Sequence, residues 1–518
     1  MVNFRAAICA ALFLFAPATI GQAQDVTLSS PDGAVEISGN LLGFDGEFYR
    51  VDTKFGELTL DGSGVSCEGP GCPSLSDFVA EVTLSGSARM AEVLLPALIE
   101  GFALRNGYKT RRDPLPEGNF EYILLQGEGR PVARFSFLVS STDVGFAELI
   151  AQQADIVMAR REIRATEQTL ARAAGLGDMT AETRSRIVAL DAMVPVVAPE
   201  NPVTRISIPD LAGVFSGTIT NWQALGGPDA PISVHMPLEN SGLTQGFADR
   251  VLAASGKQLT QDLRYHERGT TLVRRVATDP FAIGISSFSN TGTARMLTLT
   301  GSCGFSLRAN RRGIKTEDYP LTAPMFLYLP QRRLAKVARD FLAYVRGPGA
   351  QIVIRRAGFV DQAPERISMN AQGDRLSNAI LAAGPEVKLD ELQRLVTRLT
   401  GFRRLTTSFR FEAGSARPDA QSRSNVEQLA RALETGLYDG KVLNFVGFSD
   451  GDGAAAGNRS IALKRAESVR DAVLATAESG SVARVSVQVD AFGEALPMAC
   501  DDSGWGRQVN RRVEVWVQ

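Results

Sequence analysis

Residues 447–469, GFSDGDGAAAGNRSIALKRAESV, predict a strand, a glycine-rich turn and a long helix. The helix follows from residues at i, i+4, i+7 and i+11, the spacing of one buried stripe: Ala462, Ala466, Val469 and Val473. Asn458 and Arg465 are seven positions apart and share a flank of this helix. Asp450 stands at the end of the strand, where a chain reversal can bring its carboxylate opposite the Arg465 guanidinium. One fixed negative group and one fixed positive group suit a zwitterionic ligand.

The same stretch, with GRQVNRRVEVWV at 506–517, resembles the OmpA-like peptidoglycan-binding domains. The resemblance implies that Asp450 holds the ammonium group, and Arg465 the carboxylate, of diaminopimelate in the cell-wall stem peptide. It implies binding roles at four further matching positions: Asn458, Arg507, Asn510 and Arg511. The alternative for an isolated Asp and Arg at this spacing is a solvated surface ion pair. A calcium loop starting at Asp450 is excluded, because Ala455 and Ile461 would occupy its glycine and glutamate positions.

Composition places the chain among ordinary globular proteins. Its 518 residues, 44 % hydrophobic and 22 % charged, suffice for two or three domains. The formal charge of -2 provides no electrostatic footprint for nucleic acid.

Residues 1–23 predict a signal peptide, because Arg5 precedes an apolar run from Ala6 to Ala16, and Gly21 and Ala23 supply small residues for cleavage. We therefore expect an exported protein.

Export determines how the cysteines are interpreted, because disulfides persist in an oxidising periplasm. Cys67 and Cys72 flank the turn EGPG and are predicted to form a local disulfide. Cys303 and Cys500 either bridge or remain two buried thiols, and the sequence favours neither.

Two histidines in 518 residues argue against a metal site or histidine-based catalysis, and we expect no cofactor. A hydrolase using Ser87 or Ser241 is the weakest interpretation. No base is evident near either serine, since His235 and His266 are the only histidines and no G-x-S-x-G elbow occurs.

The remaining chain divides by pattern. Short alternating runs over 24–76 predict a small antiparallel β unit. Strands alternate with amphipathic helices over 77–365, which predicts α/β architecture with parallel pairing. The segment 366–400 is predicted to be a linker or a docking helix, with Leu389, Leu392, Leu395, Val396 and Leu399 on one side. The segment 401–518 predicts an α+β domain of order β-α-β-α-β-β with helices on one face.

The α/β segment resembles the phosphate-type, PstS-like periplasmic solute-binding proteins. Seven stretches carry the resemblance: SGSARM at 85–90, ADIVMARREI at 154–163, IPDLAGVFSGTITNWQALGG at 208–227, ENSGLTQGF at 239–247, DPFAIGISS at 279–287, YPLTAPMFLYLP at 319–330 and GAQIVIRRAGFV at 349–360. It implies two α/β lobes joined by crossing strands, lobe one comprising 77–185 plus 290–365 and lobe two the residues between. The ligand would lie in the cleft, where helix N-termini favour an anion.

The resemblance implies an anion site built from residues of both lobes: Ser87, Asp155, Arg161, Ser241, Gly242 and Thr244. Arg89 is a further candidate ligand, a cation that this chain has where the family pattern has a hydroxyl. The family pattern has hydroxyls where this chain has Ala88 and Leu243, which weakens the expectation of tight phosphate binding. Among the cations we expect Arg161 to matter most, because a guanidinium can hold two oxygens at once.

The sequence thus predicts a periplasmic binding protein that is not an enzyme. Its cleft would bind phosphate or a related oxyanion, with an ABC permease as a candidate recipient. Its C-terminal domain would attach it to peptidoglycan beneath the outer membrane of a Gram-negative envelope. The alternative is a structural envelope protein whose degenerate lobes bind another protein.

Overall fold

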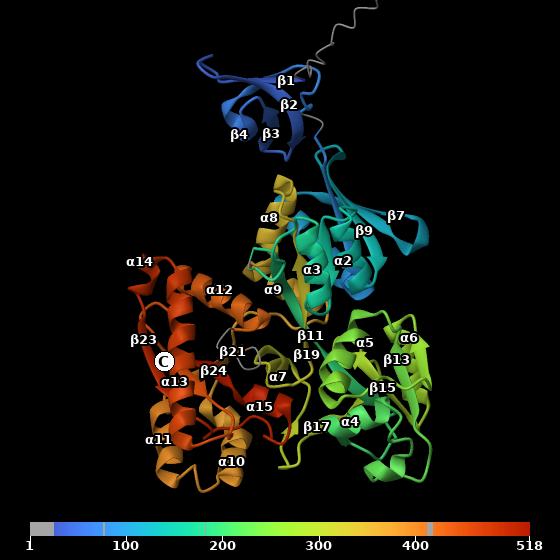
Figure 1. Cartoon of the computed structure of the whole chain (residues 1–518), viewed down its shortest axis with the longest axis vertical. Coiled ribbons are helices and arrows are strands. Elements are labelled where there is room, and N and C mark those ends of the chain that lie inside the picture. The colour runs from blue at the N-terminus through green and yellow to red at the C-terminus, as the bar shows by residue number, and fades with distance from the viewer. Residues whose placement is uncertain (1–24, 76–77, 182, 412–417) are drawn as a thin grey trace, which may run out of the picture. The chain divides into compact units, whose positions relative to one another are not determined.

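The computed structural model describes residues 25–75, 78–181, 183–411 and 418–518. The predicted signal peptide, 1–23, therefore lies outside the described residues. The chain forms two compact units, 1–78 and 79–518, which are described separately (Figure 1).

The first unit contains one antiparallel sheet of order β4-β3-β2-β1-β5. Its strands are β1 (Val26–Ser29), β2 (Glu36–Phe44), β3 (Phe48–Thr53), β4 (Gly56–Asp61) and β5 (Ser66–Glu68). Alternate residues of β1 and β3 are buried, so the predicted period of two holds and one face forms a small core. Cys67 and Cys72 form a disulfide with their Cα atoms 5.8 Å apart, as the sequence predicts.

The second unit begins with a two-lobed α/β fold built on a continuous mixed sheet of order β14-β13-β15-β11-β19-β10-β6-β9-β8-β7. The strands of lobe one are β6 (Ala80–Ser87), β7 (Lys109–Pro114), β8 (Phe120–Gln126), β9 (Arg130–Ser140) and β10 (Ile156–Ala159). The strands of lobe two are β13 (Ser233–Pro237), β14 (Leu263–His266) and β15 (Ala282–Ser287). Parallel pairing joins β10, β6 and β9 in one lobe and β14, β13 and β15 in the other, as expected.

Two strands cross between the lobes. β11 (Ser185–Val197) pairs along its first half with β19 (Thr322–Tyr328), and along its second half with β15 of lobe two. β19 in turn pairs with β10 of lobe one. The run of apolar residues in β11 is explained by this position, since all its residues from Ile187 onward are buried.

Helices cover the sheet in each lobe. Lobe one has α1 (Leu95–Asn106), α2 (Thr142–Ile150), α3 (Ala165–Ala173), α8 (Lys336–Val345) and α9 (Pro348–Arg356). Lobe two has α4 (Ile208–Phe215), α5 (Gly242–Phe247) and α6 (Gly269–Thr278). Its Trp222 is fully buried and donates its indole N–H to the Phe281 carbonyl at 2.9 Å, so the NWQALGG stretch forms a packed corner.

The predicted boundary of lobe two is wrong on its C-terminal side. β12 (Arg205–Ser207) pairs with β17 (Thr298–Thr300), which pairs with β18 (Ser306–Leu307). β16 (Arg295–Met296) also pairs with the lobe-two end of β11. Residues 290–307 therefore belong to lobe two, and the chain returns to lobe one through β19. Sequence reasoning missed this because such short strands carry no periodic signal.

The C-terminal domain is a sheet of order β20-β21-β24-β22-β23. Its strands are β20 (Arg366–Ile367), β21 (Arg403–Arg410), β22 (Val442–Phe448), β23 (Ser486–Ala491) and β24 (Arg512–Val517). Its helices are α10 (Gly373–Ala382), α11 (Leu389–Leu399), α12 (Ala420–Glu434), α13 (Ala455–Thr476), α14 (Ser479–Val482) and α15 (Gly504–Asn510). The predicted order β-α-β-α-β-β is confirmed for its main elements. The predicted stripe of α13 is also confirmed, since all four residues are buried.

The segment predicted as a linker packs on the second face of this sheet. Leu395 and Leu399 of α11 form a core with Val446 and Trp516, whereas α12 and α13 cover the opposite face (Figure 1). The expectation of helices on one face holds for α12 and α13 within 401–518, and the docking-helix alternative fits 366–400 better than a linker. Leu389 remains 69 % exposed, so only part of the predicted apolar stripe is buried.

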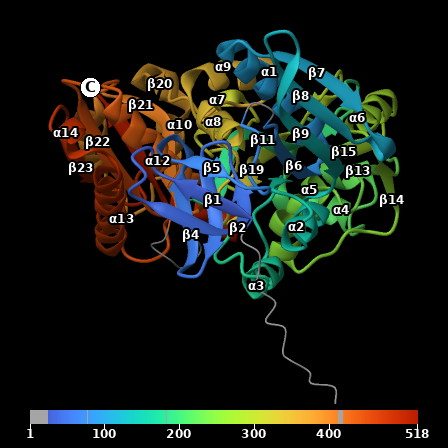
Figure 2. The ribbon, with the colours of Figure 1, turned by 90° about the horizontal axis from the view of Figure 1, so that it is seen from above.

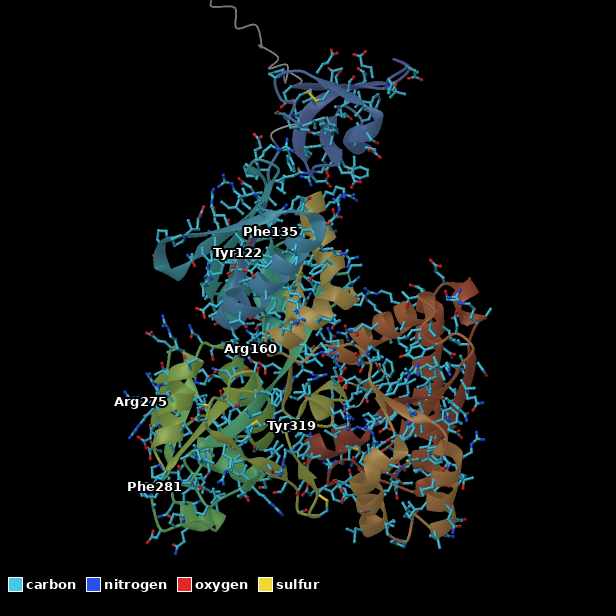
Figure 3. All side chains as sticks on the ribbon, turned by 180° about the vertical axis from the view of Figure 1, so that it is seen from behind. Tyr122, Phe135, Arg160, Arg275, Phe281 and Tyr319 are labelled. Carbon is cyan, nitrogen blue, oxygen red and sulfur yellow. A yellow bond between two sulfur atoms is a disulfide. The ribbon has the colours of Figure 1, made fainter. Side chains whose placement is uncertain are left out.

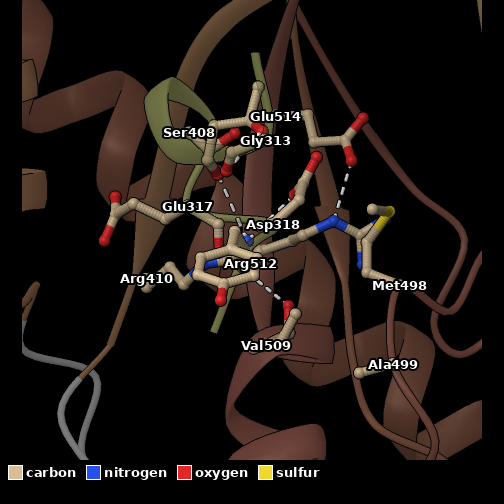
Figure 4. A network of polar contacts seen from close by, with 12 residues as sticks. Gly313, Glu317, Asp318, Ser408, Arg410, Met498, Ala499, Val509, Arg512 and Glu514 are labelled. Carbon is tan, nitrogen blue, oxygen red and sulfur yellow. Dashed lines mark hydrogen bonds and ion pairs between the residues drawn. The ribbon is translucent and has the colours of Figure 1, made fainter. Parts of the chain in front are cut away.

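Buried ionic groups join the C-terminal domain to the two-lobed fold (Figure 4). Asp318, shortly before β19, accepts from Arg404 at 2.8 Å and from Arg410 at 3.0 Å. Glu514, fully buried in β24, accepts from Arg512 at 2.7 Å and pairs with Arg375 at 2.5 Å.

A disulfide also connects the two folds: Cys303 in lobe two bonds to Cys500, with their Cα atoms 5.6 Å apart. This resolves the two alternatives that the sequence left open.

Candidate functional site

The first candidate site lies where the lobes meet, at the carboxyl ends of β6 and β10. Ser87 is the last residue of β6, and Arg160 directly follows β10. Gly242, at the start of α5 in lobe two, lies directly against Thr142 and Arg160 of lobe one. Figure 3 shows Arg160 between the lobes, and Figure 2 shows α2 beside α5. Carboxyl ends of strands facing helix N-termini are a common place for a ligand in α/β proteins.

A buried carboxylate organises this site. Asp191 in β11 is fully buried and accepts from Arg160 Nη2 at 2.9 Å. It also accepts from the Ser289 backbone N–H at 3.1 Å and from the Ser287 hydroxyl. Arg89 donates to the Ser289 carbonyl at 3.1 Å. Arg160 thus pairs directly with Asp191, whereas Arg89 is held at the neighbouring Ser289 with Asp191 and Glu92 nearby.

Both arginines keep unused hydrogen-bonding capacity. The Nε atoms of Arg89 and Arg160 are buried and have no hydrogen-bond partner within the described part of the chain. Burial lowers the pKa of both guanidinium groups, and the neighbouring Asp191 carboxylate opposes this shift. Because buried cations and donors are costly to leave unmatched, an anion entering here would be stabilised.

Two of the predicted anion ligands are placed differently from expectation. Arg161 is held by Glu167 through two bonds of 2.8 and 2.7 Å, and its Nε donates to Gln245 at 2.8 Å. Asp155 precedes β10, whereas Arg160 follows it, so five residue steps of about 3.3 Å, roughly 16 Å in all, separate them. Asp155 accepts from the Thr83 N–H at 2.8 Å and pairs with Arg332. Asp155 therefore lies at the opposite end of β10 from Arg160.

The predicted lobe-two residues cap and pack α5. Ser241 is its N-cap and accepts from the Thr244 N–H at 3.2 Å. The Thr244 hydroxyl donates to the Pro237 carbonyl at 3.0 Å. Leu243 packs in the hydrophobic core of lobe two. Gly242 is therefore the member of this set that the structure places against lobe one.

Sequence reasoning missed Arg160, Asp191, Ser287 and Ser289. A usable signal existed for Asp191, because it is a lone carboxylate inside an apolar run, and such a group is buried only with partners. The remaining three are brought to it by tertiary packing.

The second candidate site lies at the end of β22 in the C-terminal domain. Asp450 is 8 % exposed and accepts from Arg511 Nη1 at 2.8 Å. Arg465 flanks this pair, with its guanidinium carbon 5.3 Å from the centre of the Phe411 ring. Burial lowers the pKa of Arg465, Arg511 adds to that effect by repulsion, and Asp450 opposes it. The arrangement therefore contains the predicted Asp and Arg, with Arg511 as the direct partner of Asp450.

The other predicted residues of this site hold its loops. Asn458 donates to Glu494 at 2.6 Å. Asn510 is fully buried; it accepts from the Met498 N–H at 2.7 Å and donates to Asp501 at 2.8 Å. Both side chains are thus used within the protein and would act by positioning the loops around Asp450.

Arg507, the last of the predicted residues, also holds a loop: it donates to the Asp501 carbonyl at 2.8 Å.

Burial raises the pKa of Glu494, and nearby carboxylates, Asp450 among them, add to this shift. The surroundings of Asp450 are therefore acidic enough to favour a cation beside it.

Neither a serine-based nor a metal-based site emerges in the described ranges. His235 contacts Ser233 and His266, not Ser87 or Ser241. No group of three or more potential metal ligands occurs among the residues that the structure covers. Within the same residues, no helix combines the length and apolarity needed to span a membrane.

Comparison with known proteins yields two family matches. The PBP superfamily domain matches residues 74–347, and the OmpA family matches residues 410–511.

Sequence relatives include the SphX protein of Synechococcus elongatus, 28 % identical over 266 residues that cover 48 % of this chain and 76 % of that protein. The phosphate-binding protein PstS of Bacillus subtilis is 25 % identical over 189 residues, covering 36 % of this chain and 60 % of that protein.

Among solved structures, an ABC-type phosphate transport receptor from Vibrio cholerae matches with a TM-score of 0.41 and 19 % identity, covering 54 % of this chain and 99 % of the receptor. Because the first family match spans more than half of the 518 residues, the chain belongs to the PBP superfamily and carries a C-terminal domain of the OmpA family.

Proposed function

We propose that this chain is an exported envelope protein of the periplasm that binds a small oxyanion, phosphate among the candidates, and is held non-covalently on peptidoglycan. The outer-membrane side of the wall is its proposed location, and an ABC permease is a possible recipient of the ligand. Two binding functions are proposed and no catalytic one.

Anion binding is supported mainly by two arginines at the junction of the lobes: Arg160, which pairs with Asp191, and Arg89, which donates to Ser289 beside it. Both guanidinium groups retain a buried N–H without a partner, and hydroxyl groups of Ser287 and Ser289 lie beside them. The phosphate-binding name of the Bacillus subtilis relative makes phosphate the first ligand to test.

The test is calorimetric titration of the full chain with inorganic phosphate. Arg160→Ala should weaken binding roughly 10- to 100-fold, since a hydrogen bond to a charged group contributes about 1.5–3 kcal/mol. Arg161→Ala is the matched comparison, because Arg161 is held by Glu167. Loss of binding in Arg161→Ala with retention in Arg160→Ala would reverse the assignment.

Absence of binding to any oxyanion would favour the alternative, in which the lobes bind another protein. One observation fits that alternative: lobe-to-lobe contacts already satisfy many polar groups, as in the Arg161 to Gln245 bond.

Attachment to the wall is supported by the Asp450, Arg465 and Arg511 group. In our proposal the diaminopimelate ammonium binds Asp450 and its carboxylate binds Arg465, while Arg511 holds the Asp450 carboxylate in place. Repulsion between Arg465 and Arg511 would decrease when a carboxylate enters.

Co-sedimentation with purified sacculi tests this proposal. Asp450→Ala and Arg465→Ala should each cost about 2–5 kcal/mol if the ligand charges are desolvated. Arg459→Ala is the matched control, since Arg459 lies on the same helix but pairs with Glu391 at 3.0 Å. If the Asp450 and Arg465 variants pellet like wild type, the wall assignment is wrong.

A further inference from the structure

A positively charged cavity lies away from the lobe junction, between lobe one and α12 of the C-terminal domain. It has a volume of about 40 Å³. Lobe one contributes the start of β11 and the end of α8, and α12 forms the facing wall. Its polar lining consists of Thr180, Ser185, Arg186, Arg346, Gln351, Gln362, Arg423, Ser424, Glu427, Gln428 and Arg431.

The charges of this lining do not balance. Four arginines face one carboxylate among the described lining residues. That carboxylate, Glu427, is shared: its Oε2 atom lies 2.9 Å from Arg346 and 2.8 Å from Arg431. Arg186 forms no ion pair with a carboxylate in the described part of the chain, so the lining contains more positive than negative charge.

Arg186 shows the consequence most directly. Its Nε atom is buried with no hydrogen-bond partner in the described chain. Burial lowers the pKa of its guanidinium to about 10; repulsion by Arg346 and Arg431 adds to this, and Glu427 opposes it. A buried donor that faces like charges is stabilised by an anion.

The remaining polar groups suit a compact acceptor-rich ligand. Ser424 and Gln428 of α12 meet Gln362, with Gln428 Nε2 donating to Gln362 Oε1 at 2.8 Å. A buried water requires about 10–15 Å³ of such a cavity. The cavity therefore has room for about three waters or one tetrahedral oxyanion, and excludes a nucleotide or a sugar.

We propose that this cavity binds one sulfate or inorganic phosphate ion between lobe one and the C-terminal domain. The ion contacts Arg186 and Arg346 from the lobe and Arg423 and Arg431 from α12. It thereby links the two folds electrostatically, at a site separate from Arg89 and Arg160. This inference does not depend on the proposed function of the lobe junction.

The test uses the full chain carrying Arg160→Ala, so that the lobe-junction site is weakened. Thermal unfolding is followed in sodium sulfate, and separately in sodium phosphate, against sodium chloride of equal ionic strength. We expect at least one of the two oxyanions to raise the midpoint, because a ligand that binds the native state stabilises it by mass action. Arg186→Gln should weaken that anion's apparent affinity roughly 10- to 100-fold.

Arg184→Gln is the matched control, since it removes the same charge two residues away and Arg184 does not line the cavity. Arg431→Gln tests the opposite wall and should weaken the anion's apparent affinity as Arg186→Gln does. Without anion, Arg186→Gln should unfold at or above the parent midpoint, because a repelled cation is removed. No response to either anion in the parent, or an equal response in Arg186→Gln and Arg184→Gln, would overturn the proposal.

Discussion

Replacing Glu514 with Gln should destabilise the C-terminal domain by about 3–5 kcal/mol, the usual cost of breaking a buried ion pair. Glu514 is fully buried and is approached by three guanidinium groups, those of Arg375, Arg404 and Arg512. Glutamine keeps the shape and removes the charge. Of the three cations, Arg404 would keep its ion pair with Asp318 at 2.8 Å.

The pKa of Glu514 gives an independent magnitude. Burial alone would raise this pKa, but Arg375, Arg404 and Arg512 lower it from 4.5 to about 2. At 1.36 kcal/mol per unit the shift corresponds to about 3 kcal/mol. Because the folded-state pKa is depressed, this stability is fully present above pH 4.5 and is lost as the pH falls toward 2.

Hydrogen exchange during urea unfolding, read by mass spectrometry on residues 442–448 and 512–517, measures this domain separately from the lobes. Glu514→Gln should shift the transition of these peptides to lower urea at pH 7 and flatten their pH dependence between 4.5 and 2. Glu478→Gln, an exposed site in the same domain, is the control. Equal transitions in Glu514→Gln and wild type would refute the ionic account of this core.

Two further predictions concern the backbone and the cysteines. Gly447→Ala should destabilise the C-terminal domain by about 1–3 kcal/mol or more, because a Cβ at Gly447 would overlap the backbone carbonyl of Ala462. Gly457→Ala in the open part of α13 should be neutral or stabilising in the same urea assay, and equal losses in both would contradict the packing argument. Non-reducing peptide mapping of exported protein should recover Cys67 with Cys72 and Cys303 with Cys500, and reductant should lower stability by about 2–5 kcal/mol. Recovery of free thiols at these positions would disprove the pairing.

The parts of the fold predicted from sequence were those set by local periodicity. The α13 stripe, the β22 turn and the alternation of strands and helices all follow from spacing within one element. The β17 and β18 strands and the packing of α11 were missed because distant chain segments determine them.

The candidate sites show the same limit at single-residue scale. The side chains of successive residues in extended backbone point in opposite directions. An error of one position in the sequence therefore assigns the anion site to Arg161 in place of Arg160. Arg160 pairs with Asp191, whereas Arg161 pairs with Glu167. The partner of Asp450 is Arg511, 61 residues away, and only the return of β24 beside β22 brings it there.

The place of β19 between β10 and β11 has a consequence for the order of folding. Most of lobe two, over 198–321, is contiguous in the chain and can form as soon as it is synthesised. Lobe one cannot form at that stage, because β11 pairs with β19, with Ser185 opposite Tyr328, and β19 is synthesised later. Until then β10 and β11 each present an unpaired edge, a template for aggregation. A nascent chain should therefore complete lobe two first, and one that ends before 322 should need a chaperone to stay in solution.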